Sequence, residues 1–575
     1  MPKYLMPVGN TDFKEIRETG LYYIDKTMLI DQLVGKSGAK VTLFTRPRRF
    51  GKSLNMSMLQ HFFDIRENSE SLFEGLAISK DKELCNSWMN QYPTILVSFK
   101  DVSGSNFESA FKRVRTEISK LYERYTFLYE NNSKLSELQQ RLFRRILMRE
   151  SDDEDLKESL MLLTQLMYEF YDKTPVILLI DEYDVPMAKG DANGYYRDIT
   201  DIMSVMLSKA LKDNPYIKFA VLTGCLRIAK ESIFTGLNNP KIYSILDYGF
   251  QEYFGFTDSE IDRLLADTGF TEYKEKIKQW YDGYRFGDTD IYCPWDVLNY
   301  VSDLQQKAGV EPKDYWANTS GNDILKQFLN SKFNPRSDFE ALLNGKCIKK
   351  RIVENITYND LISSEDNLWS VLLMTGYLTV VPEDEVPAED ISSNDINGVY
   401  LRLVNNEIKE LFSTTVSDWF KETVYKNSRD DLFKALWDGN AAELANIISR
   451  YLRTTISFYD YSESFYHAFL AGLFSGFGDI SVTQKRKPGS ISIKSNREYG
   501  EGRADVVIKN RITHTAAVLE FKVAENITDV SSMCDVALSQ IHDIGYAEAL
   551  QEDEGYDLIS YGVIFYKKRC FIKKG

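Results

Sequence analysis

The chain contains several short, uninterrupted apolar runs separated by longer stretches with helical periodicity. Apolar runs rich in valine, isoleucine and leucine are typical of strands that are buried on both faces of a parallel sheet. Strands that alternate with helices in this way predict an α/β fold. The runs are Val41–Phe44, Pro93–Phe99, Val176–Ile180 and Lys218–Thr223.

The first run leads directly into Arg46-Pro-Arg-Arg-Phe-Gly-Lys-Ser53, and helix-forming residues follow it. The order strand, loop, helix, with Gly51-Lys52-Ser53 at the helix start, predicts a phosphate-binding loop. Gly51 permits the tight turn that aims backbone N–H groups at phosphate oxygens, and the helix N-terminus adds positive potential. We expect Lys52 to reach the β- and γ-phosphates of a nucleotide and the Ser53 hydroxyl to ligate Mg²⁺.

Three arginines distinguish this loop from the general pattern. Arg46 stands where the pattern begins with glycine, and Arg48 and Arg49 add two more guanidinium groups. We count all three as candidate nucleotide contacts. The alternative is a basic surface turn that happens to contain the Gly-Lys-Ser sequence.

The run from Val176 ends directly in two carboxylates, Asp181 and Glu182. Ligands of open α/β sheets bind at the carboxyl ends of the strands. We expect Asp181 to belong to the Mg²⁺ shell and Glu182 to polarise the attacking water. Ser53 and Asp181 should then lie close together at the ends of adjacent strands, since both serve one metal ion. A core strand that ends in an ordinary acidic turn is the alternative, and the phosphate-binding loop in the same chain weakens it.

The run that ends at Thr223 places this hydroxyl where such folds carry a polar sensor of the γ-phosphate. Arg227 and Lys230 follow shortly after it. Either residue could act as an arginine-finger-like group, within the chain or toward a neighbour. An interpretation as surface ion-pair partners is equally good for each of them.

The stretches between and after these runs suggest helical additions to the core. Residues 106–170 are charged and helical in pattern, which predicts helices inserted into the nucleotide-binding core. Beyond Gly255 the pattern is helical and aromatic, and Thr257 with Glu260 forms a capping box. We interpret this part as a helical, winged-helix-like lid whose aromatic residues are mostly core. The acidic, proline-containing stretch Val381–Gly398 predicts an exposed loop or linker.

A second chemical site is predicted near the end of the chain. Two β-rich runs around residues 504–509 and 516–523 flank a polar turn and predict a hairpin. A turn centred at residues 512–513 places Asp505 opposite Glu520, and Lys522 shares the face of Glu520. Two carboxylates can hold Mg²⁺, and an ammonium beside them can stabilise a phosphate. An exposed ion pair between Glu520 and Lys522 is the alternative.

Composition limits the functional classes. The chain has 575 residues and a net charge of −15, which opposes general adhesion to nucleic acid. The charge is uneven, because residues 481–575 carry 14 Lys/Arg against 13 Asp/Glu, which leaves −16 for the first 480 residues. The six cysteines form no CxxC pair, so neither a zinc site nor a disulfide framework is expected. Without a signal-peptide pattern or a long apolar segment, we expect a cytoplasmic protein with no membrane partner.

The chain resembles a family of bacterial AAA-ATPase-like proteins that carry a C-terminal PD-(D/E)XK nuclease-like domain. The resemblance rests on RPRRFGKS, IDEYD and YYIDKT, and on three further stretches that begin at Thr223, Phe254 and Tyr281. It implies ATP and Mg²⁺ as cofactors, and in this family arginine also replaces the first glycine of the loop. It further implies that Asp505, Glu520 and Lys522 occupy the nuclease positions, with Ala504 in place of the proline. Glu463, Gln540 and Tyr546 stand where flanking residues of such sites lie.

The expected fold class is therefore α/β, in three parts. A three-layer P-loop NTPase core with inserted helices should span residues 1–250, and the lid and connector should span 251–395. A helical lead-in and an α/β restriction-endonuclease-like domain should span 396–575, with a core from about residue 462.

Two functions are compatible with the sequence. The first is an ATPase whose state controls a metal-dependent nuclease that acts on nucleic acid, DNA in the first instance. The resemblance connects such proteins with defence against foreign DNA or with mobile elements. The second is an ATP-operated switch or scaffold whose nuclease-like domain only binds a partner. A homo-oligomer is compatible with both functions.

Overall fold

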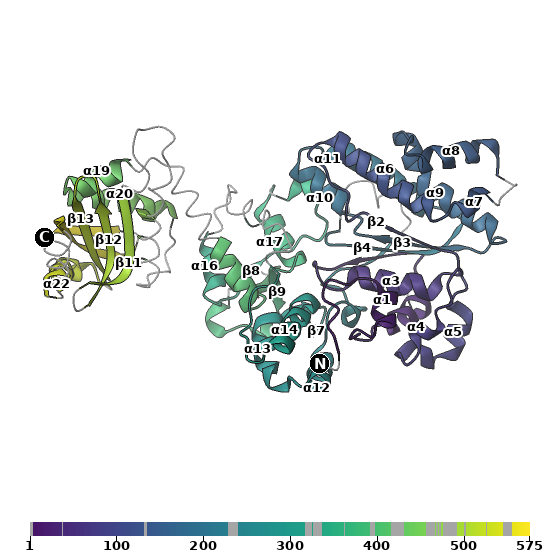
Figure 1. The fold of residues 1–575 in the computed structure, drawn as a ribbon, viewed down its shortest axis with the longest axis horizontal. Coiled ribbons are helices and arrows are strands. Elements are labelled where there is room, and N and C mark those ends of the chain that lie inside the picture. The colour runs from purple at the N-terminus through teal and green to yellow at the C-terminus, as the bar shows by residue number, and fades with distance from the viewer. Residues whose placement is uncertain are drawn as a thin grey trace. The chain divides into compact units, whose positions relative to one another are not determined.

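A computed structural model gives the fold of the chain in two compact units (Figure 1). Unit 1 comprises residues 1–333 and 345–411, and unit 2 comprises residues 334–344 and 412–575. The expected boundary after residue 395 therefore falls inside unit 1. The structure describes all residues except 1–3, 37, 131–134, 228–239, 317–324, 326–335, 362, 392–396, 416–429, 456–465, 467–469, 471–472, 475–490, 500–501, 525, 544–554 and 568.

The core of unit 1 is a five-stranded parallel sheet with the order β2-β3-β4-β1-β5. All four strands expected from the apolar runs are present, and the short β5 is an addition at the edge. β1 and β3 are buried along their whole length, as expected for a sheet covered on both faces. The strands are β1 (Val41–Thr45), β2 (Thr94–Ser98), β3 (Val176–Asp181), β4 (Ile217–Gly224) and β5 (Lys241–Tyr243).

The strand order corrects one expectation. β1, which leads into the phosphate-binding loop, does not neighbour β3, because β4 lies between them. Both strands pair with β4 in parallel, so the three carboxyl ends still meet at one edge of the sheet. The polar groups of the loop must therefore reach across the end of β4, and Thr223 lies at that end.

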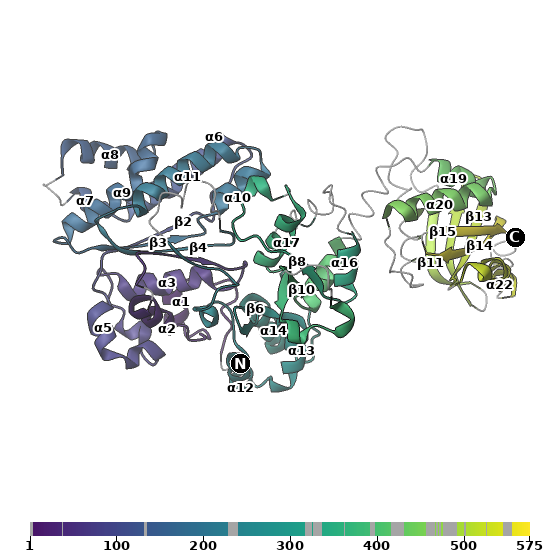
Figure 2. The ribbon, with the colours of Figure 1, turned by 180° about the vertical axis from the view of Figure 1, so that it is seen from behind.

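Helices cover both faces of this sheet, which gives the expected three layers (Figures 1 and 2). One face carries the helix that follows the loop, α3 (Lys52–Phe63), together with α1 (Phe13–Glu18), α4 (Glu70–Phe73) and α5 (Lys82–Trp88). The other face carries α6 (Phe107–Glu123), α9 (Asp153–Phe170), α10 (Val185–Ala192) and α11 (Tyr196–Leu211).

The predicted helical insertion between β2 and β3 is confirmed. It consists of α6, α7 (Phe127–Glu130), α8 (Glu137–Leu147) and α9. Capping boxes at Asn106, Ser136 and Asp152 start the three long helices, since each side chain accepts a hydrogen bond from the backbone three residues later. The apolar faces of these helices join one core with β2, β3 and α11.

The lid is packed into unit 1. It contains α12 (Asp258–Thr268), α13 (Lys274–Tyr281), the hairpin β6 (Tyr284–Phe286) and β7 (Thr289–Ile291), and α14 (Pro294–Gln306). Thr257 and Glu260 form the expected capping box at α12. Glu260 also binds the buried Lys26 at 2.6 Å, so the YYIDKT segment packs against the lid.

A three-stranded antiparallel sheet completes unit 1, with the order β8-β10-β9. Its strands are β8 (Ile348–Lys350), β9 (Leu378–Val381) and β10 (Val399–Leu403), and α17 (Glu365–Met374) precedes β9. The acidic stretch from Val381 to Gly398 lies between β9 and its neighbour β10 in the sequence and therefore belongs to unit 1, and its described part includes the short 3₁₀ turns Glu383–Glu385 and Ala388–Asp390.

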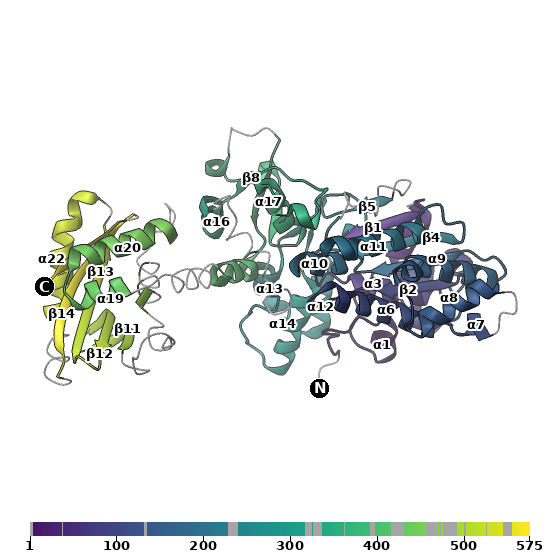
Figure 3. The same ribbon diagram turned by 90° about the horizontal axis from the view of Figure 1, so that it is seen from above.

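Unit 2 is built on a five-stranded sheet with the order β11-β12-β13-β14-β15, in which only β13 and β14 are parallel. One face packs on α19 (Asp430–Trp437) and α20 (Ala441–Thr455), and the other on α22 (Val530–Asp543) (Figure 3). The strands are β11 (Ile491–Tyr499), β12 (Gly502–Asn510), β13 (Thr515–Val523), β14 (Asp557–Tyr566) and β15 (Arg569–Lys574). No described helix of the chain is long and apolar enough to cross a membrane.

Candidate active sites

The loop after β1 has the backbone conformation that a phosphate-binding loop needs. Gly51 adopts φ 78° in the left-handed region and forms the N-cap of α3. A Cβ at this position would meet no neighbouring atom within 4 Å, so a side chain would have room there. The glycine is needed because other residues rarely adopt this positive φ. The first N–H groups of a helix have no acceptor within the helix, and Gly51, Lys52 and Ser53 line the cavity, as an anion site requires.

Lys52 is buried and turned back into its own loop. Its Nζ donates hydrogen bonds to the carbonyl oxygens of Arg46 at 3.0 Å and Pro47 at 2.8 Å, and lies 3.7 Å from Sγ of Cys225. These neutral acceptors hold the ammonium at the bottom of the loop. A phosphate above the loop would offer the same ammonium a charged acceptor, which is a stronger partner.

Ser53 and Asp181 meet across the end of β4. The Ser53 hydroxyl donates to Oδ2 of Asp181 at 2.7 Å, and the Thr223 hydroxyl donates to Oδ1 of the same carboxylate. The expected proximity of Ser53 and Asp181 is thus present, although their strands are not adjacent. A hydroxyl and a carboxylate in contact beside a phosphate-binding loop form a donor set that fits Mg²⁺, which prefers oxygen ligands and keeps several waters.

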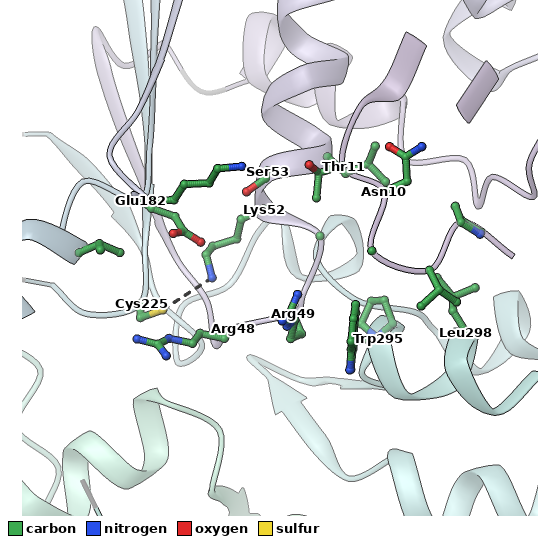
Figure 4. Close-up of a pocket in the computed structure, with 18 of the residues that line it drawn as sticks. Asn10, Thr11, Arg48, Arg49, Lys52, Ser53, Glu182, Cys225, Trp295 and Leu298 are labelled. Carbon is green, nitrogen blue, oxygen red and sulfur yellow. Dashed lines mark hydrogen bonds between the residues drawn. The ribbon is translucent and has the colours of Figure 1, made fainter. Parts of the chain in front are cut away.

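Glu182 follows Asp181 at the mouth of the same site. It adopts φ 51°, which turns its side chain out of the strand direction and into the cavity that the loop borders (Figure 4). Burial raises the pKa of this carboxyl, while the charges of Lys52 and Arg48 lower it. A carboxylate with a raised pKa is better suited to accept a proton from water near neutral pH.

The three arginines of the loop have different positions. The Arg46 side chain is fully buried, and its Nη1 donates to the carbonyl oxygens of Thr45 and Tyr243. Its guanidinium lies about 5 Å from the rings of Phe254 and Phe286, and burial lowers its pKa to about 9. Arg46 therefore lies underneath the loop, where it supports the backbone and does not line the cavity, contrary to the expected nucleotide contact.

Arg48 and Arg49 are exposed and line the cavity, as expected for nucleotide contacts. Arg49 adopts φ 72°, and its guanidinium lies 4.0 Å from the ring of Trp295 at the start of α14. Arg227 is half-buried and does not belong to the cavity lining, whereas Lys230 lies outside the described residues. The structure thus brings Arg48 and Arg49, but not Arg227, to this site.

The cavity has a volume of about 370 Å³, within the usual range of small-ligand sites. Figure 4 shows Glu182 and Cys225 on one side of Lys52, and Trp295 with Leu298 on the other. Sequence reasoning did not assign Trp295 to the site, because the aromatic stretch of the lid was interpreted as core. The segment Pro7–Thr11 also lines the cavity and carries no motif that could have predicted this role.

The hairpin of unit 2 has the predicted register. Val506 pairs with Leu519, and continuing this ladder by one residue places Asp505 opposite Glu520. Oδ2 of Asp505 accepts a hydrogen bond of 3.0 Å from the backbone N–H of Phe521, which fixes the Asp505 carboxylate beside Glu520. Lys522 lies two residues further along β13, so the three side chains belong to one face of the sheet.

This face is the one that α22 covers. Val507 lies two residues from Asp505, and Val518 lies two residues from Glu520, so both valines are on the face of the site. Both valines pack against Ile541 of α22. Gly562 pairs with Glu520 on the next strand, and a Cβ there would lie 2.6 Å from the carbonyl oxygen of Cys534. The glycine thus allows α22 to approach the site. Gln540 lies on α22, whereas Glu463 and Tyr546 lie outside the described residues.

Two carboxylates with oxygen donors fit Mg²⁺, which usually takes one or two carboxylates and retains water. Within the part of the chain that the structure describes, no three His, Cys, Asp or Glu side chains form a metal cluster. In the described part of the site, Asp505 and Glu520 would therefore bind the ion, and water molecules would complete its coordination.

Comparison with known families agrees with the two expected domains. Residues 7–234 match a family model described as predicted AAA-ATPase, and residues 461–575 match a model of the PD-(D/E)XK nuclease superfamily. The chain joins an AAA-ATPase-like domain to a PD-(D/E)XK domain. Domains of these two families generally use a nucleotide and a divalent metal.

A similar protein occurs in Azotobacter chroococcum mcd 1, where it is described as "Uncharacterized protein in vnfD 5'region". It is 26% identical over 394 residues, which are 68% of this chain and 66% of the relative. The match thus spans just under two thirds of the relative's length, and its description adds no activity.

Beside the AAA-ATPase-like cavity lies a buried acid pair that sequence reasoning missed. Asp296, on α14, and Glu407 are both fully buried. Oε1 of Glu407 accepts hydrogen bonds from the backbone N–H groups of Tyr315 at 2.7 Å and Trp316 at 2.9 Å. Burial raises the pKa of Asp296 to about 7, and burial together with the Asp296 charge raises the pKa of Glu407. Isolated acidic residues in a helical stretch carry no signal for such a pair.

The acid pair predicts that unit 1 loses stability as pH rises. Since the folded-state pKa values are raised above the unfolded value of about 4, the folded state holds the protons more tightly. The contribution of Asp296 is complete below about pH 4 and is lost as pH rises toward 7, and that of Glu407 is lost over a range that extends above pH 7. Asp296→Asn cannot ionise, so its thermal midpoint should fall less between pH 5 and pH 8 than that of the wild type.

Thermal unfolding at several pH values, followed by circular dichroism, measures this difference. Asp198→Asn, at an exposed position of α11, is the matched control and should keep the wild-type pH dependence. Equal pH dependence of the wild type and Asp296→Asn would contradict the raised pKa values.

Proposed function

We propose that the protein binds and hydrolyses ATP at the first site and cleaves nucleic acid with Mg²⁺ at the second. The contact between Ser53 and Asp181 carries the first assignment, because it joins the phosphate-binding loop to a carboxylate from a different strand. Glu182 follows directly, at the mouth of the same cavity. A loop, a metal-binding pair and a candidate base in one cavity are the parts that phosphoryl transfer requires.

At the first site each side chain has a separate task. Lys52 would leave the carbonyl oxygens of Arg46 and Pro47 and bind the β- and γ-phosphates. Ser53 and Asp181 would hold Mg²⁺, which neutralises charge on the phosphates when bound. Glu182 would orient the attacking water and accept its proton, and Thr223 keeps the Asp181 carboxylate in place through its hydrogen bond.

At the second site Asp505 and Glu520 would hold Mg²⁺, which lowers the pKa of a bound water when present. The hydrogen bond from the Phe521 N–H fixes the Asp505 carboxylate in the orientation that metal binding requires. Lys522, on the same face, would stabilise the negative charge that develops on the scissile phosphate. The substrate class is therefore a phosphodiester of DNA or RNA.

We further propose that the nucleotide state of the first site controls cleavage at the second. The two sites belong to separate compact units, so each has its own core and can be disabled alone. The expected biological context is defence against foreign DNA or the activity of mobile elements.

The decisive experiment uses the full-length chain. ATP hydrolysis is measured with Mg²⁺ and with EDTA, and cleavage is measured on single- and double-stranded DNA and RNA with Mg²⁺ or Mn²⁺, with and without ATP. Metal-dependent hydrolysis together with metal-dependent cleavage is the expected result. ATP hydrolysis without cleavage of any of these substrates would favour the switch or scaffold function.

A further inference from the structure

The cavity of the AAA-ATPase-like domain carries a strong excess of positive charge. Among the described residues that line it, five side chains are cationic, and Glu182 alone carries a carboxylate. This excess occurs in a chain whose first 480 residues carry −16. Arg48, Arg49 and Lys52 belong to the phosphate-binding loop, but Lys100 and Lys189 come from other elements and belong to no recognised motif.

Lys100 lies just beyond the carboxyl end of β2. Ser98, the last residue of this strand, pairs with Asp181, and the N–H of Phe99 donates to the carbonyl oxygen of Asp181 at 3.0 Å. Lys100 is the next residue, so its backbone borders the segment that carries Asp181 and Glu182. Its side chain is exposed and lines the cavity.

Lys189 reaches the same cavity from α10. This helix begins at Val185, three residues after Glu182, and both Val185 and Lys189 line the cavity. Residues four apart lie on one face of a helix, so α10 presents this face to the site. The Lys189 side chain is exposed.

The ammonium groups of these two lysines differ from that of Lys52 in their surroundings. Among the described residues no ion pair or side-chain hydrogen bond involves the ammonium of Lys100 or Lys189, whereas Lys52 is held by two carbonyl oxygens. Two cationic side chains that have no counter-ion among the described residues, in the cavity that Glu182 also lines, attract an anion to it. Trp295 and Leu298, on the other side of Lys52 from Glu182, offer aromatic and aliphatic surface (Figure 4).

We propose that Lys100 and Lys189 bind the terminal phosphate of the nucleotide and supply the positive charge for its transfer within the same chain. The proposal rests on the ATPase function proposed above. In the reaction the water oxygen forms a bond to the γ-phosphorus, and the bond from that phosphorus to the bridging β-phosphate oxygen breaks. Glu182 takes a proton from the water, and ADP and inorganic phosphate leave. The ammonium groups of both lysines offset the charge that moves to the leaving oxygen.

This arrangement has two consequences. Turnover per chain should not depend on protein concentration, because no residue from a second chain is needed to complete the site. The triphosphate should also bind more tightly than the diphosphate, since the two lysines contact only the terminal phosphate. The second consequence is measured without hydrolysis.

The test measures the affinities of the full-length protein for ADP and for a non-hydrolysable ATP analogue, and the turnover number at several protein concentrations. Lys100→Ala and Lys189→Ala should each weaken analogue binding by about tenfold or more, since a hydrogen bond to a charged group contributes about 1.5–3 kcal/mol. ADP affinity should change little, and the turnover number should fall. Lys82→Ala, at an exposed position of α5, is the matched control.

The possible failures are distinguishable. An unchanged preference for the analogue over ADP in both variants would overturn the role of the lysines and leave the ATPase function intact. A turnover number that rises with protein concentration would overturn completion of the site within one chain. Wild-type protein that binds neither nucleotide would overturn the ATPase function and this inference together.

Discussion

Lys52→Ala should abolish nucleotide binding and therefore ATP hydrolysis. Lys52 is buried at the bottom of the loop, and no other described cation occupies that position. Removal of one partner from a buried, hydrogen-bonded charge pair costs about 2–5 kcal/mol, so the affinity for ATP should fall by about 100-fold or more. Binding of a fluorescent ATP analogue and release of phosphate measure the two effects.

Glu182→Gln separates binding from chemistry at the same site. Glutamine keeps the size of the side chain but cannot accept the proton of the attacking water. Loss of a general base costs about 10²–10⁴ in rate, so turnover should collapse while the nucleotide still binds. The control is Lys82→Ala, which lies outside the cavity and should behave as wild type. Equal hydrolysis by the wild type, Lys52→Ala and Glu182→Gln would contradict the assignment of the site.

Lys522→Ala should abolish metal-dependent cleavage of nucleic acid and leave ATP hydrolysis unchanged. Lys522 shares the face of Asp505 and Glu520, where an ammonium can stabilise the transition-state charge. Loss of one such group lowers a rate by about 10²–10³. ATP hydrolysis should persist, because the residues of the first site belong to unit 1 and Lys522 belongs to unit 2. Both activities are measured on the same protein preparation.

Asp505→Ala removes a predicted metal ligand and should also stop cleavage. It should in addition weaken the binding of Mn²⁺ to the protein, which calorimetry measures, whereas Lys522→Ala should retain Mn²⁺ binding. Lys434→Ala is the control, since this exposed residue lies on α19, which packs on the opposite face of the sheet. Cleavage that persists in both site variants would show that these residues are structural, and the scaffold function would then be favoured.

Most of the sequence features that predicted these sites are local, because each is set by residues that lie close together in the chain. The apolar run before Thr45 and the run before Asp181 required strands, and Gly51 required a turn with positive φ. The capping box at Thr257 and Glu260 likewise depends only on residues three apart. The hairpin register of Asp505 and Glu520 was predictable because a one-residue slip would expose the apolar face of both strands.

Other features depended on contacts between segments far apart in the chain. The order of the strands placed β4 between β1 and β3, which no local pattern encodes, and so made Thr223 a partner of Asp181. The family resemblance explained the presence of Arg46 in the loop but not its burial, which depends on the aromatic rings of Phe254 and Phe286 in distant segments. The polarity of a residue indicates what it can bind, but its burial is decided by what packs on it.

The limits of the nucleotide cavity show the same division. The sequence determined the loop, the two carboxylates at the end of β3 and the hairpin of unit 2, because each is set by hydrophobic periodicity or by a short motif. Only the tertiary structure decided that Trp295, Lys100 and Lys189 line the cavity. These residues come from the lid, from the end of β2 and from α10, and only the packing of those elements around the sheet brings them to one place.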